Sequence, residues 1–202
     1  MKLMKSPWMF LPLTLLLLLF TPVSQSMMVL PVNLDDLSKQ ADIAFRGVCI
    51  EKTKSAFTHP DTKEAIPIWT YTFRVEEVVK GSVDQSFYLK QWAPLSAEEP
   101  LKGNYGPFLA TTTFDVGKEY LLFLSAPSPF GFRTVLGYDQ GKFSVTKNAQ
   151  GKSVVVNPYN NRGLMQGIPA KGLSKSQKEL LKAPSGPIPY DEFVPLVKKA
   201  VE

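Results

Sequence analysis

The sequence predicts one small, mostly β domain built as an antiparallel barrel, with a short N-terminal helix and a C-terminal amphipathic helix. Short segments with strand-like patterning recur along the chain, and turns containing glycine separate them. The clearest segment, 69–79, alternates through Trp69, Tyr71, Phe73 and Val75. Repeated strand and turn signals at this spacing are typical of small antiparallel barrels and sandwiches.

The strand predictions follow apolar alternation and the positions of the turn residues. We expect strands over 43–53, 69–79, 86–92, 119–125, 132–137, 142–146 and 153–157. The stretch 55–67 is polar, and we expect it to be a loop. Apolar positions change parity at Gly47 and again at Glu76-Glu77. Such switches predict bulges that curl a sheet, which favours a barrel.

Three local signals predict helices near the ends of the domain. Asn33 is a good N-cap for a helix over 34–41, and Ser174 with Gln177 forms a capping box for a second. The last helix carries one apolar stripe at intervals of three and four, formed by Phe193, Leu196, Val197, Ala200 and Val201. We expect Pro195 in its first turn, and the barrel to cover the stripe. The alternative is that the stripe docks a partner.

The chain begins with the pattern of a secretory signal. Lys2 and Lys5 precede an apolar run over 9–20, and Ser24-Gln25-Ser26 supplies small residues for cleavage. The run is shorter than the roughly 20 residues of a membrane-spanning helix. We therefore expect a signal peptide over 1–26, a barrel domain over 27–158, and a linker with a helical tail over 159–202. The mature protein would be periplasmic or extracellular, with no membrane span after cleavage.

The sequence has few residues that could form a catalytic or metal-binding site. The one histidine, His59, lies in a polar stretch, and the one cysteine, Cys49, lies in an apolar strand where a buried inert thiol is expected. One His and one Cys do not supply the ligands of a zinc site. Neighbouring carboxylates such as Glu76 and Glu77 point to opposite faces of a strand. We expect no cofactor and no nucleic-acid partner, since the net charge of +5 is scattered.

The order of segments resembles a known superfamily. "ADIAFRGVCIEK", "YTFRVEEVVKG", "FDVGKEYLLFL" and "GKFSV" follow one another as in the OB-fold domain of the tissue-inhibitor-of-metalloproteinases and netrin-like superfamily, and in exported bacterial proteins of that type. The resemblance covers about 34–145 and implies an OB-like barrel. The animal inhibitors bind zinc through an N-terminal disulfide-bonded cysteine, and a chain with one cysteine cannot form that disulfide.

The residues most suited to binding lie in two loops. The excursion 92–114 is long for a compact domain, and loops of this length are often functional. It carries Trp92, Tyr105 and Phe108, and the tip over 127–133 adds Phe130 and Arg133. Aromatic and arginine side chains are enriched among binding hot spots. Alternatively, these rings cover the mouth of the barrel.

Three functional classes fit these observations. The preferred one is a non-catalytic binding or interaction module of the cell envelope, whose partner is a protein or another envelope component that the sequence does not specify. The alternatives are a hydrolase using carboxylates from distant positions and a passive structural protein of the envelope.

The signal-peptide prediction has a direct test. The exported protein should have an intact mass that begins at or within a few residues of Met27. A full-length product retained in the membrane would contradict it.

Overall fold

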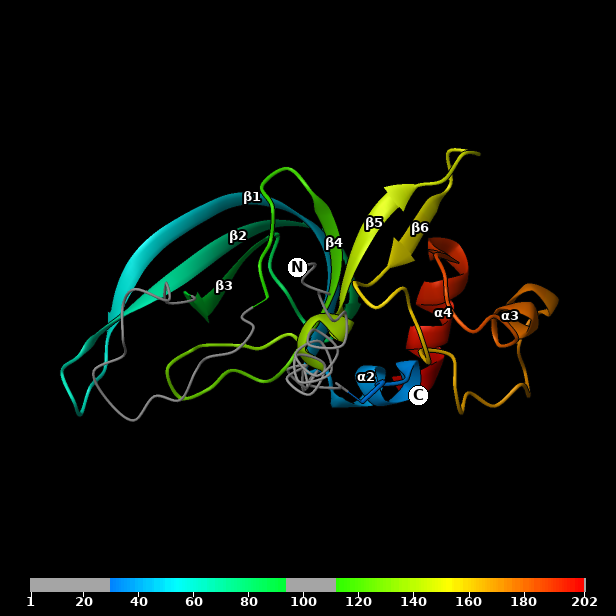
Figure 1. Cartoon of the computed structure of the whole chain (residues 1–202), viewed down its shortest axis with the longest axis horizontal. Coiled ribbons are helices and arrows are strands. Elements are labelled where there is room, and N and C mark those ends of the chain that lie inside the picture. Colours follow the sequence, from blue (N-terminus) through cyan, green and yellow to red (C-terminus); the bar gives the residue numbers. More distant parts are fainter. Residues whose placement is uncertain (1–29, 94–111, 202) are drawn as a thin grey trace, which may run out of the picture. The chain divides into compact units, whose positions relative to one another are not determined.

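The computed structural model describes residues 30–93 and 112–201. The chain divides into the units 1–30 and 31–202, and the fold described here is that of the second. Its helices are α2 (Leu34–Gln40), α3 (Lys175–Leu180) and α4 (Tyr190–Val201), with a 3₁₀ turn, η3 (Tyr138–Gly141). Its strands are β1 (Ile43–Thr58), β2 (Ala65–Lys80), β3 (Ser86–Trp92), β4 (Glu119–Leu124), β5 (Lys142–Lys147), β6 (Ser153–Val156) and β7 (Ile188–Pro189) (Figure 1).

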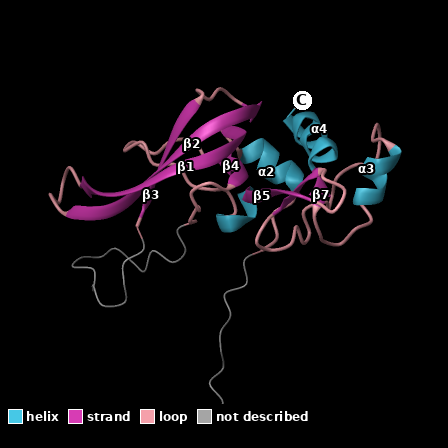
Figure 2. Cartoon of the chain, turned by 90° about the horizontal axis from the view of Figure 1, so that it is seen from above, coloured by secondary structure: helices cyan, strands magenta, loops and turns pink. Residues whose placement is uncertain are grey.

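The described strands form one antiparallel sheet in the order β3-β2-β1-β4-β5-β6-β7. The prediction of a mostly β antiparallel fold with a helix near each end is therefore confirmed. Within the described residues the sheet is open, since β3 and β7 lie at its two edges, so it is only loosely barrel-like (Figure 2).

Both predicted bends lie at the same place in the sheet. The pairing of β1 with β2 shifts between Arg46 and Gly47, whose partners are Glu77 and Val75, so that Glu76 is left between them. A Cβ atom at residue 47 would lie 2.7 Å from the carbonyl oxygen of Arg74. Glycine is thus required for the close approach, and the predicted bulges at Gly47 and at Glu76-Glu77 are confirmed.

The predicted loop over 55–67 is wrong, because β1 and β2 continue through most of it as a hairpin. The hairpin closes between His59 and Glu64, where the His59 N–H donates to the Glu64 carbonyl at 2.8 Å. Residues 50–56 are all exposed, so this part of β1 shows no apolar alternation. We call the part of the hairpin over 50–70 the arm; it curves away beyond β4 (Figure 1).

Two lysines lie in the outer part of β1, within the arm. Beyond Val48, β1 pairs with no other described strand on the side where β4 lies. The Lys52 ammonium sits 4.2 Å from the centre of the Trp69 ring, and that of Lys54 lies 5.9 Å from it. These cation–π contacts hold two positive charges over Trp69, the cross-strand partner of Lys54 on β2.

The last helix closes one of two hydrophobic clusters. Phe193 of α4 lies with its ring 5.1 Å from that of Phe143 on β5, and 6.4 Å from that of Phe123 on β4. The expectation that the sheet covers the apolar stripe of α4 is confirmed for Phe193, Leu196 and Val197, which are all buried. The other cluster gathers around Phe73 on β2.

The segment 160–172, expected to be a linker or a surface loop, folds as consecutive turns against the first cluster. Leu164 and Met165 are buried there. Two buried amides organise the turns: Asn157 accepts from the Asn161 N–H at 2.8 Å, and Asn161 accepts from the Asn157 N–H at 2.9 Å. Polar residues therefore form a fixed structure, because their hydrogen bonds are satisfied inside it.

The local helix signals agree with the structure, with two corrections elsewhere. Asn33 caps α2, and the capping box of Ser174 and Gln177 begins α3. The predicted strand 132–137 is only a single bridge between Val135 and Leu124, because the segment belongs to a loop. Since α4 begins at Tyr190, Pro195 lies in its second turn and not in the first.

The effect of truncating Phe73 on the melting temperature tests the strand assignment. Its side chain is fully buried, and truncating a buried phenylalanine removes about 3 to 5 kcal/mol. We expect Phe73→Ala to lower the melting temperature sharply. Tyr88→Ala, which truncates a ring that is 62 % exposed, is the control and should change it little. Similar small changes in both variants would contradict the packing.

Candidate functional site

Five aromatic side chains meet at the outer end of the arm. They come from the end of β1, the hairpin turn, the last position of β3 and the loop over 125–134, and we call them the aromatic cluster: Phe57, His59, Trp92, Phe130 and Phe132. Three segments that are distant in the sequence thus supply one surface.

Ring contacts define the interior of the aromatic cluster. The Trp92 and Phe132 rings stack at 4.3 Å with an interplanar angle of 18°. Phe57 lies between 5.2 and 5.7 Å from the rings of Phe132, Phe130 and Trp92. Phe132 is 7 % exposed and Phe130 is 40 % exposed. Phe132 therefore belongs to the packed base of the cluster, whereas Phe130 presents much of its ring to solvent.

Hydrogen bonds hold the loop that carries Phe130. The Ser125 N–H donates to the Thr134 carbonyl at 2.9 Å, and the Ser128 N–H donates to the Phe132 carbonyl at 2.7 Å. Arg133 donates to the Ser125 carbonyl at 2.6 Å and forms an ion pair with Asp42. The base of the loop is therefore fixed to the start of β1.

His59 links the hairpin turn to the cluster. Its ring lies 5.6 Å from that of Phe130, and its Nδ1 accepts from the N–H groups of Asp61 and Thr62 at 3.3 and 3.4 Å. These bonds orient the imidazole ring on the hairpin turn. We expected an exposed loop residue, and the structure shows a half-buried side chain that helps form the turn.

The predicted binding residues are only partly brought together. Trp92 and Phe130 lie in the aromatic cluster, whereas Arg133 is 19 % exposed with its guanidinium directed at the base of the loop. Tyr105 and Phe108 lie outside the described residues.

The sequence reasoning missed Phe57, His59 and Phe132. Phe57 and His59 alternate just before the turn sequence "PDT", which is the signal of a strand that reaches the turn. That signal could have placed both side chains on one face of the arm.

A second group of polar side chains lies where β1, β2, β4 and α4 meet. Arg46 lies 3.5 Å from a carboxylate oxygen of Glu119 and 3.9 Å from one of Glu77, and its guanidinium is 4.8 Å from the centre of the Tyr190 ring. The Tyr190 hydroxyl donates to Glu77 at 2.8 Å. These two carboxylates from distant positions therefore share one cation in a network that ties α4 to the sheet.

Burial alters the acidity of several hydroxyl and thiol groups. It raises the pKa of Tyr71 from 10.0 to about 12, and it raises the pKa of Tyr120. It also raises the pKa of Tyr190, where the hydrogen bond to Glu77 adds to the effect. Burial also raises the pKa of Cys49, whose side chain is fully buried. The raised pKa disfavours the reactive thiolate form.

Comparisons with known proteins identify no relative: no family model matches the chain, and no curated protein matches it significantly. In the ranges 30–93 and 112–201, no three potential metal-ligating side chains lie close enough together to hold an ion. No helix in the same ranges is long and apolar enough to cross a membrane.

The buried tyrosines predict a loss of stability at alkaline pH. Tyrosine in an unfolded chain ionises near pH 10, whereas Tyr71 in the folded protein keeps its proton to about pH 12. Between these values the folded state binds more protons, so the free energy of unfolding falls as pH rises, by up to about 1.4 kcal/mol per pKa unit. Below pH 10 this contribution does not change with pH.

Chemical denaturation at pH 8 to 11 measures this loss. Tyr71→Phe should make the decline shallower, and Tyr88→Phe, which removes an exposed hydroxyl, is the matched control. The same decline in Tyr71→Phe as in the unaltered protein would contradict the assignment.

Proposed function

We propose that the protein is an exported, non-catalytic binding module of the cell envelope whose contact surface is the aromatic cluster. The observation that carries the proposal is the position of Phe130, a half-exposed ring on a hydrogen-bonded loop, in contact with the rings of Phe57 and His59. A ring held in place before binding loses little conformational freedom when a partner covers it.

The arrangement of the cluster supports an interaction surface. Hot spots are typically aromatic side chains seated on a packed base that other contacts shield from water. Phe57 and Phe132 form such a base for Phe130, and they come from elements fixed by backbone hydrogen bonds. Tyr105 and Phe108, which lie outside the described residues, belong to the same proposal as contact residues.

The alternative of a hydrolase gains no support from the carboxylates of Glu77 and Glu119. A general acid or base must exchange protons with a substrate at a reachable position. Glu77 instead accepts from Tyr190, and Glu77 and Glu119 both lie beside Arg46. Their contacts are those of a structural network that fastens α4, which is why a binding role is preferred.

The proposal is tested by separating binding from stability. Phe130→Ala should weaken capture of a partner from a cell-envelope extract by about tenfold or more, since truncation of a hot-spot ring costs that much. The melting temperature should stay nearly unchanged, because the ring is 40 % exposed.

Two variants complete the test. Tyr159→Ala removes a ring that is 41 % exposed at a distant position and should retain the partner. Phe132→Ala should lower the melting temperature, because this ring supports the cluster from inside. If Phe130→Ala melts early, or captures every partner that the unaltered protein captures, the cluster is structural and the proposal is wrong.

A further inference from the structure

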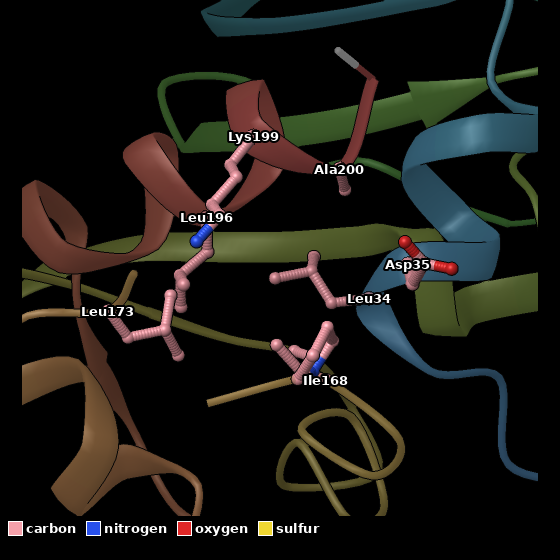
Figure 3. A pocket seen from close by; sticks show the side chains of 8 residues that line it. Leu34, Asp35, Ile168, Leu173, Leu196, Lys199 and Ala200 are labelled. Carbon is pink, nitrogen blue, oxygen red and sulfur yellow. The ribbon is translucent and has the colours of Figure 1, made fainter. Parts of the chain in front are cut away.

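An apolar cleft opens between α2, α4 and the turns before α3. Figure 3 shows Leu34 of α2, Leu173 and Ile168 of the turns, and Leu196 of α4 around it, with Ala200 at its upper edge. The cleft holds about 90 Å³ of space. We call it the α2–α4 cleft; it shares no residue with the aromatic cluster.

The rim of the α2–α4 cleft carries two charges of opposite sign. Lys199 and Asp35 lie on opposite sides of the apolar side chains (Figure 3). Asp35 is neutralised by Lys39, whose ammonium lies 2.6 Å from its carboxylate. Lys199 donates to the Lys171 carbonyl at 2.8 Å and has no carboxylate partner among the described residues.

The unbalanced charge at the rim is therefore positive. One hydrogen bond to a carbonyl uses only one of the three donors of a lysine ammonium, so Lys199 keeps donors for an anion. The neighbouring lysine on the same helix, Lys198, is different because it lies 3.8 Å from the carboxylate of Glu77. A cation with no carboxylate partner in the described ranges, beside apolar walls, matches an anionic head with a hydrocarbon tail.

We propose that the α2–α4 cleft binds a short aliphatic carboxylate, with the tail among Leu34, Leu173 and Leu196 and the carboxylate on Lys199. The space sets the length of the tail. A cavity of about 150 Å³ lined by similar side chains accommodates benzene. The smaller α2–α4 cleft suits an unbranched chain of a few carbons, and its open rim leaves the head in contact with water.

Hexanoate is the probe, and the full-length protein is titrated with it while the methyl resonances of Leu34 and Leu196 are followed by NMR. The shifts should saturate, and the Kd should fall about fourfold for each methylene added from butyrate to hexanoate, as expected when each group leaves water. Observation of these methyl groups separates the cleft from other apolar parts of the chain.

Substitutions test separately which residues contact the carboxylate of the ligand and which contact its aliphatic tail. Lys199→Gln should raise the Kd for hexanoate about threefold to tenfold, the range for a partly exposed charged contact. Lys198→Gln is the matched control and should leave the Kd unchanged. Ala200→Phe should fill the space and abolish the shifts at Leu34 while the melting temperature is retained.

Three results would overturn the proposal. One is the absence of saturable shifts at Leu34 and Leu196, and another is an equal Kd for hexanoate in Lys199→Gln and the unaltered protein. The third is hexylamine binding as tightly as hexanoate, since the proposed cation would repel an ammonium head. None of these outcomes bears on the aromatic cluster, so this inference and the proposed function can fail separately.

Discussion

The pairing of β1 with its two neighbours is the constraint on which the rest of this structure depends. β1 is hydrogen-bonded to β2 on one side and to β4 on the other over its first residues, so its alternate side chains face two different clusters. Phe45 enters the cluster around Phe73, and Ala44 enters the cluster closed by α4. A slip by one residue would exchange the two sets of side chains, which is why the register is strongly specified.

The bulge at Gly47 bends β1 and so curves the sheet. It lies where β4 leaves β1, so the inner part of the sheet carries the helices and the outer part continues as the arm. The aromatic cluster forms at the end of the arm because the loop after β4 reaches back to it, with its base held by Arg133 and Asp42. Phe130 and Phe132 are therefore positioned by a loop whose base is fixed by the contacts of Arg133.

Local chemistry made much of the fold predictable from the sequence. The caps at Asn33 and Ser174 and the break at Gly47 depend on bonds or close approaches of nearby atoms, and each is visible in a short segment. The outer end of β1, residues 55–58, was predicted as a loop because the exposed part of that strand shows no apolar alternation. Trp92 and Phe130 were proposed from residue type and loop length, whereas the contacts of Phe57 with Trp92 and Phe132 join segments that are distant in the sequence.

The lysines on the arm have a consequence for self-association. A strand edge without a partner can add the edge of another molecule, and proteins commonly prevent this with charged side chains. Lys52 and Lys54 place two positive charges on the outer part of β1, where no described strand pairs with it on the β4 side. Charges on that part of the strand disfavour edge-to-edge pairing of two arms.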